Sequence, residues 1–105
     1  MGLKETKLSA FIDSGADLTV VNMSKFEESS LKEKPPISVM FIKSPDYVGL
    51  APIYPSKIRV KNIELNVLVA IAPILEEAII GRDLMNQIII MLDGPQKVAS
   101  IYIKG

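Results

Sequence analysis

The stretch Phe11-Ile12-Asp13-Ser14-Gly15 places a carboxylate directly after a short apolar run. An ionised Asp beside apolar surface is costly unless another group pairs with it or a reaction uses it. The chain of 105 residues contains no Cys and no His, which excludes thiol nucleophiles and the Ser-His and Cys-His pairs. Acid–base chemistry must therefore rest on Asp, Glu, Lys or Tyr. Taken alone, Asp-Ser-Gly is also ordinary turn chemistry, because Asp and Ser bond nearby backbone and Gly accepts unusual dihedral angles.

A second stretch, IIGRDL at residues 79–84, joins an apolar pair to Gly, Arg and Asp. By itself this stretch is only suggestive. In this order along a strand-rich chain, the two stretches together resemble the retropepsin-like aspartic proteases, the single-domain relatives of pepsin found in retroviruses, retrotransposons and some cellular proteins. The family pattern is apolar-apolar-Asp-Ser/Thr-Gly-Ala, followed later by apolar-apolar-Gly-Arg-Asp/Asn-Leu. The resemblance covers about residues 3–92.

This resemblance implies an aspartic endopeptidase that acts on a peptide or protein substrate. Two carboxylates share one proton: one acts as a base toward water, and the protonated one polarises the peptide carbonyl. The chain has a single Asp-Ser-Gly, so the resemblance implies a homodimer with Asp13 supplied by each subunit on the two-fold axis. We expect an acid-shifted optimum, because one carboxylate must hold a proton. No cofactor and no metal are expected.

The other motif residues are implied to support the active-site loop: Ser14, Gly15, Ala16, Asp17, Gly81 and Arg82. Ser14 would hydrogen-bond across the dimer, and Gly15 would let backbone approach the carboxylate and the substrate. Asp17 and Arg82 would form an ion pair, since the Arg fork can hold a carboxylate through two bonds. A plain structural bridge is the alternative for that pair. Gly81 would pack against the loop at a point where a side chain would collide.

A hairpin over about residues 37–60 corresponds to the flap, which closes over substrate and excludes water. Its tip supplies the candidate substrate-binding residues Pro45, Asp46, Tyr47, Val48 and Gly49. Candidate walls for apolar substrate side chains are Ala16, Leu18, Val20 and Ile79. Both sets also have plainer interpretations, in which the Tyr is an exposed loop residue and the apolar residues belong to the core.

These motifs need a scaffold, and the rest of the chain is typical of short strands. Period-two alternation and β-branched runs predict strands over residues 7–12, 18–21, 37–42, 50–54, 57–61, 63–71, 88–92 and 98–103. Ser24 and Glu27 have the spacing of a capping box, which predicts a helix over 24–33 that ends before Pro35. A second brief helix is expected over 82–87. The sequence thus predicts one domain over residues 1–105, mostly β, a small closed β-barrel of the acid-protease type with one or two short helices.

The charge and hydropathy of the chain limit the classes of partner that it is expected to bind. The chain carries 12 basic and 12 acidic residues, and the basic ones are not clustered, so we expect no nucleic-acid partner. No apolar stretch reaches the roughly 18 residues of a membrane span, and the first residues lack the apolar segment of a signal peptide. We therefore expect no membrane partner and a cytoplasmic location.

Three features depart from the family pattern. Only 12 residues precede Asp13, so the first strand of the family is expected to be shortened or absent. The tip of the hairpin has one Gly and one Pro, where retroviral flaps are rich in Gly. A hairpin over 88–103 continues past the usual end of retroviral proteases and is expected at the dimer interface.

Two alternatives to a protease stay open. One is the same fold without catalysis, used for dimerisation or peptide binding. The other is an unrelated small β module whose Asp-Ser-Gly is only a turn.

Overall fold

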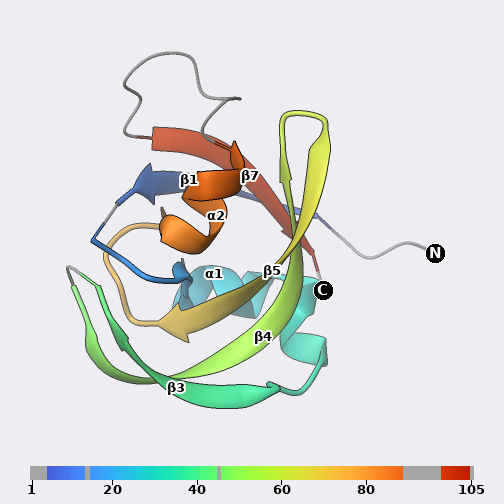
Figure 1. The fold of residues 1–105 in the computed structure, drawn as a ribbon. Helices are drawn as coiled ribbons and strands as arrows, with labels where there is room; N and C mark the ends of the chain where they lie inside the picture. The colour runs from blue at the N-terminus through green and yellow to red at the C-terminus, as the bar shows by residue number, and fades with distance from the viewer. Residues whose placement is uncertain (1–4, 14, 45, 89–97, 105) are drawn as a thin grey trace.

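The computed structural model describes residues 5–13, 15–44, 46–88 and 98–104 (Figure 1). The strands in these ranges are β1 Thr6–Ile12, β2 Thr19–Asn22, β3 Ser38–Lys43, β4 Val48–Val60, β5 Ile63–Ala72, β6 Ala78–Ile80 and β7 Val98–Lys104. The helical pieces are α1 Met23–Glu28, the single 3-10 turn η1 Ser30–Glu33, and α2 Arg82–Ile88. The expected mostly-β class with short helices is confirmed. The strand expected over 88–92 and the turn after it lie outside the described residues.

The strands form one sheet in the order β3-β4-β5-β2-β6-β1-β7. A further pairing between β4 and β7, with Lys57 opposite Lys104, closes six of these strands into a ring. The β1–β6 and β2–β5 pairs are parallel, and the other pairs are antiparallel. Strand β3 pairs with β4 alone, so the β3–β4 hairpin extends from the ring as an arm (Figure 1). Residues 39–42 of β3 are four consecutive apolar residues, yet only Ile42 among them is buried.

Buried apolar side chains gather in two clusters. The first fills the ring, and the second lies between the hairpin and the loops beside it. Strand β5 serves both, since Val69 faces the first cluster and Ala70 the second. Strand β5 runs from exposed residues at its start into core on both faces, although Leu68 on the second face is still 40% exposed.

The first helix begins and ends differently from the sequence-based expectation. Its cap is Asn22, whose side-chain oxygen accepts the N–H of Ser24 at 2.7 Å and of Lys25 at 3.3 Å. Ser29 then divides the predicted helix over 24–33 into α1 and η1, because its N–H bonds back into α1 and its hydroxyl accepts from η1. The cap therefore lies two residues before the predicted one at Ser24, and the predicted single helix is divided into two short pieces.

Strand β4 runs without a break through Pro52 and Pro55, where the sequence indicated two strands. Each proline falls where β4 has one free edge, so the missing N–H costs no ladder bond. Pro52 precedes the β4–β5 pairing, which begins at Ile53. Pro55 lies between the last β3 partner, opposite Ile53, and the first β7 partner, opposite Lys57.

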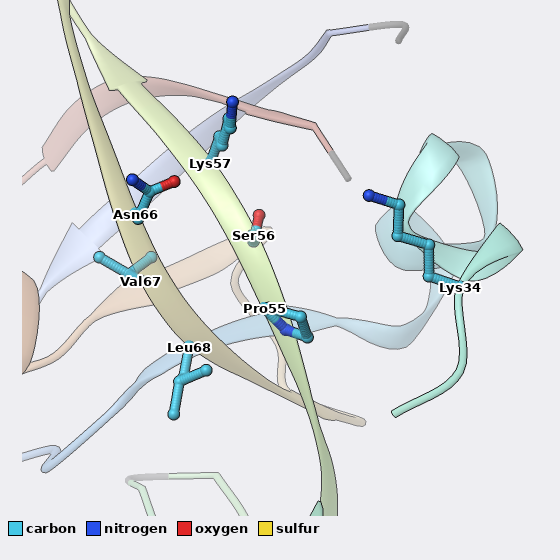
Figure 2. A pocket seen from close by; sticks show the side chains of 7 residues that line it. All are labelled: Lys34, Pro55, Ser56, Lys57, Asn66, Val67 and Leu68. Carbon is cyan, nitrogen blue, oxygen red and sulfur yellow. The ribbon is translucent and has the colours of Figure 1, made fainter. Parts of the chain in front are cut away.

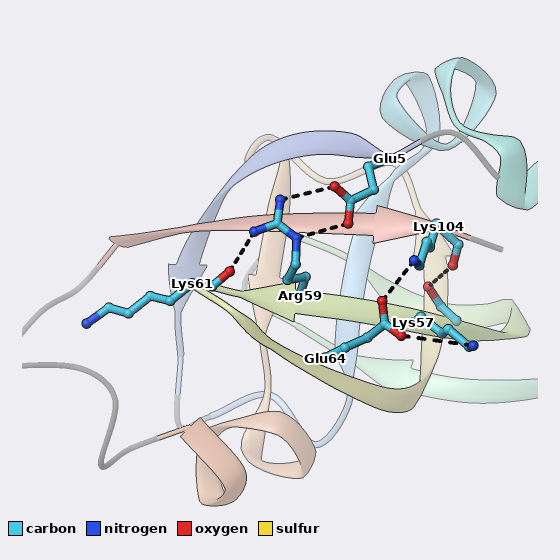
Figure 3. Close-up of polar contacts among 7 residues, drawn as sticks. Glu5, Lys57, Arg59, Lys61, Glu64 and Lys104 are labelled. Carbon is cyan, nitrogen blue, oxygen red and sulfur yellow. Dashed lines mark hydrogen bonds and ion pairs between the residues drawn. The ribbon is translucent and has the colours of Figure 1, made fainter. Parts of the chain in front are cut away.

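Charged side chains tie β4, β5 and β7 together on the outside of the ring and join them to Glu5, just before β1 (Figure 3). Arg59 of β4 donates from Nε and Nη2 to the Glu5 carboxylate, both at 3.0 Å, and its guanidinium lies 4.0 Å from the centroid of the Tyr102 ring. Lys104 of β7 pairs with Glu64 of β5 at 2.9 Å. The hydrogen bond from Arg59 holds the pKa of Glu5 below its ordinary value, and the bond from Lys104 does the same for Glu64.

Candidate active site

Asp13 opens the loop that joins β1 to β2. Its backbone N–H donates to Ile80 O at 3.1 Å, and its carbonyl accepts the Ala16 N–H at 3.2 Å. The Gly15 N–H donates to Oδ1 of the half-buried Asp13 carboxylate at 2.8 Å. The turn chemistry suggested by Asp-Ser-Gly is therefore present, and it holds the carboxylate in a fixed place rather than leaving it loose in solvent.

The second motif lies directly against this loop. A Cβ on Gly81 would stand 2.4 Å from Leu18 O and 2.9 Å from Ala16 O, which no side chain tolerates. The next residue, Arg82, donates its backbone N–H to Ala16 O at 2.9 Å. Because the loop and the start of α2 meet backbone to backbone, only Gly fits at position 81.

Arg82 and Asp17 form an ion pair through Nη2 and Oδ1. Their side chains are 60% and 74% exposed, so water screens the attraction. The pair brings the two motifs together as the sequence predicted, and its exposure favours a small structural contribution.

A buried polar contact beneath the loop was missed by the sequence reasoning. The fully buried Thr19 hydroxyl donates to Asp83 Oδ1 at 3.0 Å. The same hydroxyl oxygen accepts the backbone N–H of Gly81 at 3.4 Å. The same Asp83 oxygen accepts the Leu84 N–H at 2.7 Å. A signal existed, since a Thr in an apolar strand and an Asp in the first turn of a helix both seek partners.

The predicted pocket walls are mostly covered. Ala16, Val20 and Ile79 are each 1% exposed and belong to the second cluster, whereas Leu18 is half-buried at its edge. A cavity of about 160 Å³ opens beside them between the loop and β3. It is lined by Asp17, Leu18, Val20, Met40, Phe41, Ile42 and Lys43.

The hairpin turns one face toward this cluster and the other toward solvent. Ala51 and Ile53 of β4 are buried in the cluster, while Val48, on the opposite face, is 58% exposed. Of the predicted tip residues, Tyr47 packs against the cluster, and Val48 does not point at it. A Cβ on Gly49 would lie 2.8 Å from the Tyr47 hydroxyl, so the Gly leaves room for that ring.

The tip is also tied to a second loop. Asp46 Oδ2 accepts the backbone N–H of Leu75, in the segment between β5 and β6, at 3.1 Å. Within the tip, the Tyr47 hydroxyl donates to Leu50 O at 2.6 Å, and the Ser44 hydroxyl donates to Tyr47 O at 3.1 Å. Two further predicted site residues, Ser14 and Pro45, lie outside the described residues.

A larger cavity, of about 320 Å³, lies away from Asp13 on the outside of β4 and β5 (Figure 2). Its lining is Lys34, Pro55, Ser56, Lys57, Asn66, Val67 and Leu68, none of which the sequence marked as functional. Elsewhere in the described ranges, acidic side chains do not gather in groups of three that could hold a metal ion. No helix among the described residues is long and apolar enough to cross a membrane.

The mostly-β fold of the chain is similar to the retropepsin-like fold of a solved viral protein. The chain is similar to a solved structure described as the foamy viral protease-reverse transcriptase in complex with RNA/DNA hybrid, with a TM-score of 0.63 and 22% identity. The match covers 90% of this chain and 13% of that chain. At this level of identity the likeness establishes the fold, which is that of the protease region. No protein-family description matches the chain, and no curated protein sequence does.

Proposed function

We propose that the chain is an aspartic endopeptidase that works as a homodimer, with the attacking water held between two Asp13 carboxylates. The observation that carries this proposal is the Asp13 carboxylate itself, half-buried and held by the Gly15 N–H in a loop against which the second motif packs. A half-buried carboxylate held by a backbone N–H suits acid–base chemistry on a peptide. The retropepsin-like fold of the chain supports the same interpretation.

The reaction needs two carboxylates with unequal protonation. The ionised one removes a proton from water as the water oxygen attacks the carbonyl carbon. The protonated one donates its proton to the carbonyl oxygen. The tetrahedral intermediate then collapses: one of its hydroxyl groups returns a proton to the second carboxylate, the C–N bond breaks, and the amine leaves with a proton from the first carboxyl group. Like charges a few ångströms apart do not both ionise readily, so the pair titrates as a unit and favours an acidic optimum.

A second copy is needed because the chain has one Asp-Ser-Gly. An arrangement about a two-fold axis brings equivalent loops together and pairs Asp13 with its own equivalent. Gly81 supports this geometry by allowing α2 to lie against the loop, and the Thr19–Asp83 bond fixes the base of the loop from below. The half-buried Leu18, at the edge of the second cluster, would contact an apolar substrate side chain.

The test is cleavage of a diverse peptide library between about pH 3.5 and 7 by the parent chain and by Asp13→Asn at matched high concentration. The parent is expected to cut, with a rate that rises more steeply than linearly with protein concentration. Asp13→Asn keeps the size of the side chain but cannot hold the shared proton as a carboxylate pair does. We expect its kcat to fall by at least about a hundredfold, the lower range for losing an acid–base group.

Circular dichroism and thermal unfolding of both proteins provide the control, because a folded but inactive parent would contradict the proposal. That result would favour the same fold used for dimerisation or peptide binding. Cleavage that survives Asp13→Asn would point to a contaminating protease and would also count against the assignment.

A further inference from the structure

The walls of the predicted substrate pocket are shut in this conformation. Val20 and Ile79 are each 1% exposed, and the cluster to which they belong is completed by Ile42 of β3 and by the half-buried Tyr47 at the tip of the hairpin. A substrate side chain cannot touch surfaces that the protein's own side chains cover. The hairpin must therefore move before these walls can contact a ligand.

One polar contact ties the tip to the far side of this cluster. The Asp46 carboxylate accepts the Leu75 N–H at 3.1 Å, and the neighbouring Ile74 is buried in the same cluster at 3% exposure. Asp46 and Leu75 come from two segments 29 positions apart, so the bond bridges the hairpin and the β5–β6 loop. In Figure 1 the bend between β3 and β4 lies at the same side of the molecule as the β5–β6 connection.

Hydrogen bonds within the tip join its residues to one another. The Ser44 N–H and hydroxyl both bond Tyr47 O, and the Tyr47 hydroxyl bonds Leu50 O. These bonds lie inside the hairpin and survive if it lifts. The Asp46–Leu75 bond crosses to another element, so lifting breaks it.

We propose that Asp46 is a latch that holds the hairpin closed on its own chain, with Tyr47 and Ile42 occupying the apolar site that a substrate side chain must enter. The occupant is thus a segment of the same chain, and a peptide competes with it for the cluster. Only the competition with a peptide substrate rests on the proposed function, because the latch itself is a property of the folded chain. Breaking the latch raises the population of open molecules in which Val20 is accessible.

The absence of native Cys makes the opening directly measurable. A thiol introduced by Val20→Cys, a change to a slightly smaller side chain, reports access to the second cluster through its rate of reaction with a disulfide reagent. The neighbouring residue Val21 is fully buried and faces the first cluster, inside the ring. A thiol from Val21→Cys therefore reports opening of the whole domain and not of the hairpin.

Each reporter is combined with Asp46→Ala, which removes the acceptor, and with Asp46→Asn, whose amide oxygen still accepts from Leu75. An exposed hydrogen bond of this kind changes an opening equilibrium by roughly two- to tenfold. We expect Asp46→Ala to speed labelling of the Val20→Cys thiol by about that factor and to leave the Val21→Cys thiol unchanged. Asp46→Asn should stay within about twofold of the parent at both reporters.

The latch is overturned if Asp46→Ala changes labelling of neither thiol, and equally if it speeds both by the same factor, which would mean general destabilisation. The assay contains no peptide and needs no catalysis. A chain that fails to cleave any peptide can therefore still show the latch, and an active protease can still lack it.

Discussion

Gly81→Ala tests whether the two motifs meet as closely as the structure indicates. The added Cβ would stand 2.4 Å from Leu18 O, 2.5 Å from Leu18 C and 2.9 Å from Ala16 O. All three are backbone atoms, so no side chain can rotate away and either the active-site loop or α2 must shift. Overpacking of this kind costs about 1–3 kcal/mol. A shift also weakens the bond from Arg82 N to Ala16 O, which contributes about 0.5–1.5 kcal/mol.

The two effects together predict a loss of about 1.5–4.5 kcal/mol in the free energy of unfolding. For a domain of this size, that corresponds to a fall in Tm of roughly 7–20 °C. Urea unfolding followed by circular dichroism gives the free energy, and equal concentrations of the two proteins keep the effect of protomer concentration the same in both measurements.

Gly15→Ala is the matched control in the same loop. Its Cβ would lie 3.2 Å from Asp13 Oδ1, an atom of a side chain that can rotate by the few tenths of an ångström required. We expect a loss below about 1 kcal/mol, because only a side chain has to adjust. A Gly81→Ala protein that unfolds within about 0.5 kcal/mol of the parent would refute the close backbone approach, and with it the placement of α2 against the loop.

Two further outcomes follow from the polar contacts. Thr19→Val removes a buried hydroxyl that bonds Asp83, and we expect a loss of about 1–3 kcal/mol in urea unfolding, whereas Thr19→Ser should retain most of the stability. A loss as large with Ser as with Val would show that packing of the methyl group, and not the hydrogen bond, matters at this position. The pKa of Glu5 lies below its ordinary value because Arg59 bonds it, so its contribution is complete above about pH 4.5 and is lost as the pH falls through the lower folded value. Tm measured from pH 7 to 3 should therefore fall less steeply in Glu5→Gln than in the parent, and parallel curves would rule out this contribution.

The sequence carried the local features of the site because each depends on neighbours in the chain. Asp13 ends an apolar strand and Gly81 follows another, so their types and positions were visible without coordinates. The Arg82–Asp17 pairing was also within reach, through the resemblance, and the structure brings the two side chains together. The roles of these residues in catalysis and in dimer formation stay predictions.

Contacts between distant segments were harder to predict. The Thr19–Asp83 bond joins residues 64 positions apart, and only the register of β2 against β6 reveals it. Val48 was predicted to line the tip, and the two-residue period of β4 places it on the exposed face with Leu50, opposite the second cluster; its predicted role in substrate binding stays a prediction. The predicted start of the first helix was wrong for a local reason, because Asn22 and Ser24 are both good N-cap residues and the sequence did not rank one above the other.

Strand β4 has a mechanical consequence that its hydrogen bonds define. The first half of β4 pairs with β3 in the hairpin. The last residues of β4 pair with β5 on one side and with β7 on the other, and Arg59 and Lys57 add ion pairs there. Among the described strands, residues 54–56 have a ladder partner on the β5 side alone, and Pro55 brings no N–H to the other edge. Ser56 still reaches β7 through its hydroxyl, which donates to Lys104 O at 3.1 Å. Tyr54 and Pro55 are therefore the least constrained residues of β4, and a bend of the hairpin relative to the ring would occur there. Pro55 also lines the cavity in Figure 2, so such a bend would change the shape of that cavity.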